Sequence, residues 1–393
     1  MRRRWRAGRT QRDGAPDRNI LAAIALLAII RARLAATLLA AVAAVALAGA
    51  VPAQAGAAGP GRAFFGIQTW TVPNAAAVAM IDRGGVGTVR AVFDGPSLAV
   101  PDDGERWARH DALMTAAARA RVEVLPVLLG IPGGHAQLKR PTTRVSRMVW
   151  SRFVTSVAKR YGRGGTFWAA NPELDPAPLK AYQVWNEPNL RAYWRPATDA
   201  AGYLRLVKLT RARLRAVDSK ATIVLAGLPE SRAGTPMLAY VQAIYRQPGA
   251  RSLFDAVALH PYADDAPAVM YALDSVRAYM NGHGDRHTPI WVTEVGWATG
   301  GPRSPFTTTR AGQAARVGRT LRALIAARGR LRLERVTLFG LQDRSYRANE
   351  EPWWGPRTGL FDVAGRPKPA WRTFVGFTGG RPGGRLRSVA RSR

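Results

Sequence analysis

The stretch Ala181-Tyr-Gln-Val-Trp-Asn-Glu-Pro-Asn189 decides how the rest of the chain is interpreted. Its first half, residues 181–185, is apolar and aromatic, which is typical of a short buried strand. Pro188 cannot donate a hydrogen bond to a sheet ladder, so the strand must end before it. The sequence therefore predicts that the carboxylate of Glu187 stands at the end of a buried strand, with an amide side chain on either side.

A second stretch of the same kind, Pro289-Ile-Trp-Val-Thr-Glu-Val-Gly296, places Glu294 after another run of β-forming residues. Two carboxylates at the ends of two buried strands could supply the pair of groups that hydrolyses a glycosidic bond. Taken singly, either glutamate could be an ordinary exposed loop residue. Because Trp-Asn precedes Glu187 and Pro follows it, we favour the pair.

Around these two stretches, strand-like and helix-like segments alternate from residue 62 to about residue 377. Strand-like runs are predicted at residues 63–70, 88–94, 122–129, 181–185, 222–227, 254–260, 290–294 and 335–339. Segments of helical period are predicted at residues 75–83, 105–119, 144–161, 199–217, 236–246, 268–280, 310–328 and 369–374. The alternation indicates an α/β fold and favours a closed (β/α)8 TIM barrel forming a single domain. An open doubly wound sheet is the alternative.

Composition limits the classes of function. The chain has 393 residues and no cysteine, so it can bury a large core but has no thiol nucleophile and no cysteine-type zinc site. Neither Gly-x-Gly-x-x-Gly after the first strand nor a P-loop is present, and we predict no cofactor and no metal. The net charge of +32 comes from arginines spread through every segment, without a basic patch interleaved with aromatics. We therefore predict no nucleic-acid partner.

The first 55 residues are predicted to be a signal peptide. They contain a basic head, two apolar runs at residues 20–30 and 34–51, and the cleavage pattern Pro52-Ala-Gln-Ala55. The second run is barely long enough to span a bilayer, so a retained anchor is the alternative. We expect a spacer at residues 56–61, a catalytic domain at 62–377 and a disordered Gly/Arg-rich tail at 378–393. The mature protein is expected to be secreted or bound to the cell envelope, without stable membrane insertion, and monomeric.

In their order along the chain, these motifs resemble those of the clan A glycoside hydrolases. These are retaining (β/α)8-barrel enzymes that include cellulase-like and β-xylosidase-like families. Trp185-Asn-Glu-Pro188 matches the clan's motif after strand four, and Thr293-Glu-Val-Gly296 matches the motif after strand seven. The resemblance covers nearly all of residues 62–377 and implies that Glu187 is the acid/base and Glu294 the nucleophile.

The resemblance also implies substrate-binding residues. Asn186 would bond the sugar 2-hydroxyl next to the scissile bond. His260 and Tyr262, in Leu259-His-Pro-Tyr262, match a histidine-plus-tyrosine element whose tyrosine touches the nucleophile. Arg90 matches an arginine that neutralises and orients that carboxylate. The runs 358–362 and 365–371 resemble the clan's common ending.

One departure concerns the tryptophan that clan members usually carry at the end of strand eight, as a floor under the sugar. Residues 337–343 read Thr-Leu-Phe-Gly-Leu-Gln-Asp instead. Trp353 or Trp354 just beyond could fold back as the platform. Further tryptophans predicted to lie exposed in loops and to stack on sugar faces, with core packing as the alternative, are Trp70, Trp194 and Trp297. Of these three, Trp297 is predicted to bind substrate.

The function predicted from these observations is that of a secreted retaining glycoside hydrolase. It would cleave O-glycosidic bonds of a plant or microbial polysaccharide or oligosaccharide by double displacement. Two alternatives belong to other classes. One is a carbohydrate-binding barrel that has lost turnover, and the other is a basic, wall-associated protein that binds polyanions.

Overall fold

The computed structural model describes residues 59–94, 107–130 and 140–386. The predicted signal peptide, residues 1–55, lies outside these ranges, as does the start of the helix predicted at residues 105–119. Within the described part of the chain, no helix combines the length and the apolar character needed to cross a bilayer.

Nine parallel strands form one sheet, in the hydrogen-bonded order β5-β4-β3-β2-β1-β9-β8-β7-β6. The strands are β1 (Phe65–Gln68), β2 (Thr88–Asp94), β3 (Glu123–Leu129), β4 (Ala181–Val184), β5 (Thr222–Val224), β6 (Leu228–Pro229), β7 (Val257–His260), β8 (Ile290–Val295) and β9 (Leu333–Phe339). Each predicted run contains or overlaps an observed strand, and β6 adds two residues directly after the fifth run.

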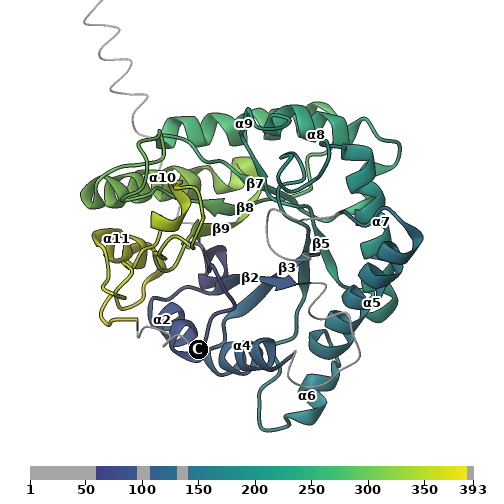
Figure 1. Cartoon of the computed structure of the whole chain (residues 1–393), viewed down its shortest axis with the longest axis horizontal. Coiled ribbons are helices and arrows are strands. Elements are labelled where there is room, and N and C mark those ends of the chain that lie inside the picture. The colour runs from purple at the N-terminus through teal and green to yellow at the C-terminus, as the bar shows by residue number, and fades with distance from the viewer. Residues whose placement is uncertain (1–58, 95–106, 131–139, 387–393) are drawn as a thin grey trace, which may run out of the picture. The chain divides into compact units, whose positions relative to one another are not determined.

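The sheet closes through the chain segment that carries β5 and β6. β5 pairs with β4, and β6 pairs with β7. Between them Val224 forms a parallel bridge to Ala256, and the backbone N–H of Leu225 donates to the carbonyl of Ala256 over 3.0 Å. Residues 222–229 therefore act as one bent strand that links the two edges. The prediction of a (β/α)8 barrel is confirmed, and the alternative of an open sheet is wrong (Figure 1).

Helices surround the barrel on its outer side (Figure 1). They are α2 (Ala75–Arg83), α4 (Ala108–Ala120), α5 (Arg144–Tyr161), α6 (Thr166–Ala170), α7 (Ala200–Val217), α8 (Met237–Tyr245), α9 (Ala266–Gly282), α10 (Arg310–Leu331) and α11 (Pro369–Thr378), with the 3-10 helices η1 (Arg62–Phe64), η3 (Ala250–Leu253) and η4 (Gly355–Arg357). The starts of several helices are fixed by side-chain caps, because an oxygen of the preceding residue accepts the third backbone N–H at Asn74, Asp199, Asp265 and Thr309.

Buried side chains form two clusters. The larger one joins the strands to the helices around them, with residues such as Phe93, Phe153 and Trp371. The smaller one, made of Leu125, Val224, Ala256, Ala258 and Trp291, comes from strands and their edges alone, as expected for side chains that fill a barrel from within.

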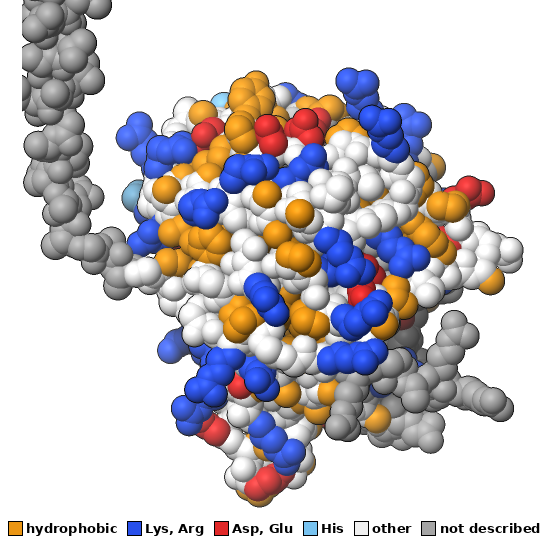
Figure 2. Space-filling model, turned by 90° about the vertical axis from the view of Figure 1, so that its left-hand side faces the viewer, with side chains coloured by type: hydrophobic (Ala, Val, Ile, Leu, Met, Phe, Trp, Pro, Cys, Tyr) orange, Lys and Arg blue, Asp and Glu red, His pale blue; other side chains and the backbone are white. Residues whose placement is uncertain are grey.

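The face that carries α10 and α11 shows how the positive charge is distributed (Figure 2). Lys and Arg side chains lie scattered there among apolar and uncharged atoms, with few Asp or Glu side chains between them. On this face the charge is dispersed, as the sequence predicts.

Part of the tail predicted to be disordered is ordered. The backbone N–H of Arg381 donates to the carbonyl of Arg83 over 2.7 Å, and that of Leu386 donates to Gly365 over 2.9 Å. Leu386 is also buried in the main core. The prediction of disorder is therefore wrong for residues 379–386, because the chain after α11 packs back onto the barrel. Residues 387–393 lie outside the described part.

Candidate active site

The two glutamates lie at the carboxyl-terminal side of the barrel strands. Glu187 follows β4, and Glu294 is the next-to-last residue of β8. The backbone around Glu187 is unusual, since Trp185 and Glu187 have φ angles of 71° and 47°. Left-handed φ values at non-glycine residues are costly and gather at functional sites, where they aim a side chain in a set direction. Here they turn the chain so that the Glu187 carboxylate reaches the barrel mouth.

The two carboxylates are close together. One oxygen of Glu187, one oxygen of Glu294 and a ring nitrogen of His260 all lie within 4.8 Å of one another. Nδ1 of His260 is 2.8 Å from Oε1 of Glu187, and its Nε2 is 3.6 Å from Oε1 of Glu294. A Cβ at Gly227 would stand 1.9 Å from Nε2 of His260, so the ring needs glycine at that position. Because both carboxylates lie next to His260, they are close enough for both to act on one atom of a bound substrate.

Arg90 of β2 holds Glu294 in place. Its Nη1 donates to Oε1 of Glu294 over 2.6 Å and to Oε1 of Gln68 over 2.7 Å. Its Nε donates to Gln183 over 2.7 Å, and its Nη2 donates to Asn186 over 2.8 Å. Of the four oxygens that accept hydrogen bonds from Arg90, three belong to neutral amides. Glu294 is therefore the one carboxylate among these acceptors that the guanidinium charge stabilises.

Tyr262 supplies a second donor to the same carboxylate. Its hydroxyl donates to Oε2 of Glu294 over 2.8 Å. The ring of Trp354 lies 4.9 Å from the Tyr262 ring, and the ring of Phe339 lies 6.4 Å from it. Both oxygens of Glu294 are thus bonded to protein donors, and an aromatic cluster stands beside the carboxylate.

Burial and charge act differently on the two carboxyls. Burial raises the pKa of Glu187 well above its ordinary range, and the negative charge of Glu294 raises it further. Burial also raises the pKa of Glu294, but the charge of Arg90 and the hydrogen bonds from Tyr262 and Arg90 oppose this rise. The pKa of Glu187 is thus raised more than that of Glu294, which favours a protonated Glu187 beside an ionised Glu294. Burial and the charge of Arg90 lower the pKa of His260, which is neutral.

The trio of Glu187, His260 and Glu294 has donor atoms close enough together to hold a metal ion. The guanidinium of Arg90, 2.6 Å from Glu294, places a positive charge where such a cation would bind. Coulomb repulsion in a buried site opposes binding of the cation. The donor set fits proton transfer and carboxylate chemistry better than it fits a metal.

Several residues of the site escape a search for charged motifs. Gln68 and Gln183 hold Arg90, and Tyr193 bonds the side chain of Asn186. Burial and the two nearby glutamates raise the pKa of Tyr193 well above its ordinary value. The glutamines carry a detectable signal, because a polar side chain within a buried strand needs a partner. Tyr193, in the loop after β4, carries no comparable signal.

The predicted tryptophans fall into two groups. Trp194 and Trp297 are only 2% and 1% exposed, and Nε1 of Trp297 donates to the carbonyl of Ala263 over 2.7 Å. The prediction that these two lie exposed in loops is wrong, because their rings pack in the core. That Trp297 contacts substrate stays a prediction. Trp353 is 38% exposed and its ring is 5.6 Å from that of Trp354.

Trp70, Trp353 and Trp354 extend the aromatic cluster beside the barrel mouth. The ring of Trp70 is 5.8 Å from that of Trp353 and 4.8 Å from that of Phe339, the last residue of β9. The loop after β9 therefore does fold back towards Tyr262. Phe339 occupies the strand end where the clan's tryptophan was expected.

A comparison with family models matches residues 147–350 to the glycosyl hydrolase catalytic core. The match covers more than half of the chain, including both glutamates. The protein belongs to this family.

Solved structures share the fold. A family 39 glycoside hydrolase from the gut symbiont Bacteroides cellulosilyticus WH2 is 19% identical with a TM-score of 0.59, over 81% of this chain and 64% of that one. The chain thus spans less than two thirds of that protein. A monomeric beta-xylosidase from Caulobacter crescentus CB15 is 17% identical, with a TM-score of 0.59 over 81% of this chain and 68% of that one. A family 10 protein from Paenibacillus barcinonensis is 16% identical, with a TM-score of 0.54 over 82% and 96%. A search of curated proteins finds no match.

Proposed function

We propose that the protein is a secreted, retaining glycosidase that cleaves O-glycosidic bonds of a polysaccharide or oligosaccharide by double displacement. Glu294 attacks the anomeric carbon while Glu187 gives its proton to the oxygen of the leaving group. Glu187 then takes a proton from water, which attacks the same carbon and releases Glu294. The sugar leaves with the configuration it had in the substrate.

The observation that carries this proposal is the unequal surroundings of two close carboxylates. Glu294 accepts hydrogen bonds from Arg90 and Tyr262, which favour the ionised form that a nucleophile needs. Glu187 contacts the neutral ring of His260 and keeps a raised pKa, which suits a general acid. An oxygen–oxygen separation within 4.8 Å is in keeping with retaining enzymes, whose carboxyls stand about 5–5.5 Å apart.

Binding of the sugar would use groups beside the pair. The amide oxygen of Asn186 accepts a hydrogen bond from Arg90, and one N–H of the same amide forms a hydrogen bond with Tyr193. The other N–H is available to a sugar hydroxyl. Trp353 and Trp354 offer ring faces for stacking, since amphipathic rings suit the apolar face of a sugar.

Azide rescue separates the two roles. For Glu294→Ala, hydrolysis of an aryl glycoside should fall at least about 10⁴-fold, because the group that forms the covalent intermediate is gone. Azide should then give a glycosyl azide of inverted configuration. For Glu187→Ala, a dinitrophenyl glycoside should still react, because that leaving group needs little protonation, and azide should give a product of retained configuration. Proton NMR of the products distinguishes the two.

The control is Glu173→Ala, which changes an exposed glutamate away from the site and should keep full activity. Opposite stereochemistry for the two site variants would reverse the assigned roles. Full activity of either variant would remove that residue from catalysis.

Secretion rests on the predicted signal peptide. Mass spectrometry of exported protein should find the mature amino terminus near Gly56. Exported protein that retains residues 20–50 would favour a membrane anchor instead.

A further inference from the structure

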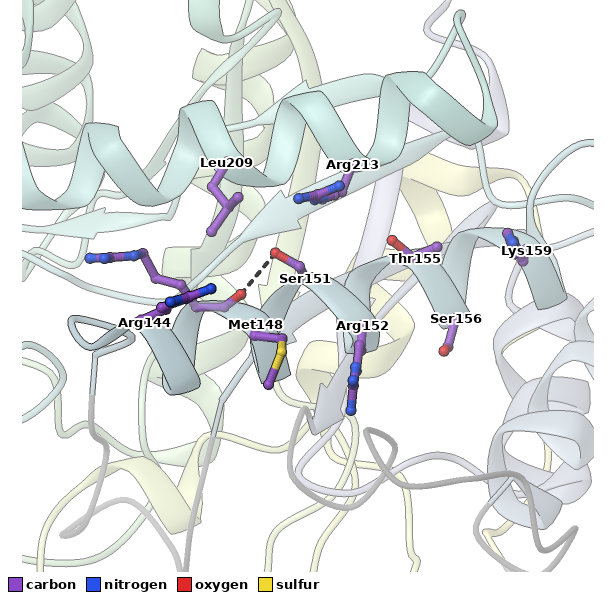
Figure 3. A pocket seen from close by; sticks show the side chains of 10 residues that line it. Arg144, Met148, Ser151, Arg152, Thr155, Ser156, Lys159, Leu209 and Arg213 are labelled. Atoms are coloured by element: carbon purple, nitrogen blue, oxygen red, sulfur yellow. Dashed lines mark hydrogen bonds between the residues drawn. The ribbon is translucent and has the colours of Figure 1, made fainter.

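A groove of about 580 Å3 is lined by residues of α5 and α7, and neither glutamate is among them (Figure 3). Leu209 and Arg213 point into it from α7, and Ser151 and Thr155 face them from α5. The residues that line it are Arg144, Arg147, Met148, Ser151, Arg152, Thr155, Ser156, Lys159, Leu209 and Arg213. Five of these ten side chains carry a positive charge, and none carries a negative one.

Within the part of the chain that the structure describes, no acidic side chain neutralises the charge of this groove. Neither α5 nor α7 contains an acidic residue. Elsewhere on these helices arginines are paired, as in the contacts of Arg160 with Asp111 and of Arg215 with Asp255. In contrast, no carboxylate of residues 59–94, 107–130 and 140–386 forms an ion pair with the five basic side chains of the groove. The groove therefore concentrates positive charge, whereas the face of α10 and α11 in Figure 2 disperses it.

A second hollow of about 310 Å3 continues the groove. It shares Arg147 and Leu209 with the first and adds Arg140 and Trp194. Asp199 also lines this hollow and pairs with Arg140 over 3.3 Å and with Arg205 over 3.6 Å, so its charge is partly neutralised, unlike that of the main groove. Arg140 lies over the ring of Trp194 at 5.8 Å, and Trp194 packs against Trp185, two residues before Glu187. The basic track thus leads from the outer wall of the barrel towards the loop that carries the acid/base candidate.

We propose that this track binds a segment of an anionic polysaccharide, of the polyuronate class, at a second site distinct from the catalytic cleft. Guanidinium groups form paired hydrogen bonds with carboxylates. The hydroxyl of Thr155 can donate a hydrogen bond to a sugar hydroxyl, and that of Ser151, which donates to the carbonyl of Arg147 over 2.8 Å, can still accept one (Figure 3). None of the ten described residues that line the main groove is aromatic, so among them the bases of a single-stranded nucleic acid would find no surface for stacking. The second site would hold a polymer on the enzyme while its neighbouring segment enters the cleft.

The test compares binding of polygalacturonate by the full chain and by two triple variants. The groove variant is Arg147→Gln, Arg152→Gln, Arg213→Gln. The matched control, Arg316→Gln, Arg319→Gln, Arg322→Gln, removes the same charge from α10. At low salt the groove variant should bind about tenfold more weakly than the wild type, and the control should stay within about twofold. Added salt should weaken binding by the wild type. Thermal unfolding midpoints within about 2 °C of the wild type establish that both variants fold.

Equal losses in the two variants would show that overall charge drives binding, which overturns the proposal. Absence of wild-type binding at low salt would also overturn it. A single-stranded DNA arm tests the ligand class. If DNA binds as tightly as polygalacturonate and depends equally on the groove arginines, the assignment to a glycan is wrong. Neutral dextran should not bind to the groove, because the track recognises charge.

Discussion

Removing one hydroxyl, by Tyr262→Phe, tests whether Glu294 is the carboxylate that must be ionised. The hydroxyl donates to Oε2 of Glu294 over 2.8 Å, while the ring packs on Trp354 and Phe339 and would stay in place. A hydrogen bond to a charged group contributes about 1.5–3 kcal/mol. Its loss should raise the pKa of Glu294, because the ionised form loses a donor. At acidic pH, kcat/KM of the variant should therefore be about ten- to hundredfold lower than that of the wild type.

The assay is kcat/KM against pH for the aryl glycoside that the wild type hydrolyses best. The acid limb of the profile should move to higher pH, and the rate should recover as pH rises because Glu294 ionises again. Tyr193→Phe is the matched control, since Tyr193 bonds Asn186 and not Glu294. It should leave the acid limb in place. An acid limb that stays put or moves to lower pH in Tyr262→Phe would refute the assignment of Glu294 as the ionised group.

Two further predictions concern stability. Burial lowers the pKa of His110 from 6.5 to about 4. The unfolded state therefore binds a proton more readily than the folded state, and the free energy of unfolding should fall by about 3 kcal/mol as pH falls from 6.5 towards 4. Above about pH 7 this loss is absent. His110→Phe should flatten this part of the stability curve in urea unfolding; identical pH dependence in variant and wild type would contradict it. Lys368→Met leaves the buried carboxylate of Asp343 without its partner and should cost about 3–5 kcal/mol. Adding Asp343→Asn should restore part of the loss, and a single variant as stable as the wild type would show that the pair contributes little.

The barrel could be predicted from the sequence because its signals are local. Neighbouring residues set the end of a buried strand before Pro188 and the starts of helices capped by Asn74 or Asp265. The catalytic candidates share this property, since Glu187 follows a strand and Glu294 lies at the end of one. The alternation of segments did not reveal α6, which is only one turn and a half long.

The surroundings of the site could not be predicted in the same way, because they depend on contacts between distant residues. Whether Trp194 faces solvent or Trp185 is decided by how the loop after β4 folds. The cradle of Arg90 brings Gln68 and Gln183 together, residues more than a hundred positions apart. The resemblance to the clan identifies residues that match its motifs. It does not identify the neutral residues that hydrogen-bond to them, such as these glutamines.

The buried pair of Lys368 and Asp343 ties down the loop that carries Trp353 and Trp354. Nζ of Lys368 donates to Oδ1 of Asp343, to Thr299 and to the carbonyl of Arg357. In a chain without cysteine, this buried salt bridge does what a disulfide could do elsewhere, because it holds together the two ends of the segment from residue 343 to residue 368. Reducing agents cannot open it, and salt screens it little because water is excluded. The aromatic platform should therefore keep its shape in reducing or saline surroundings that would loosen a disulfide or a surface ion pair.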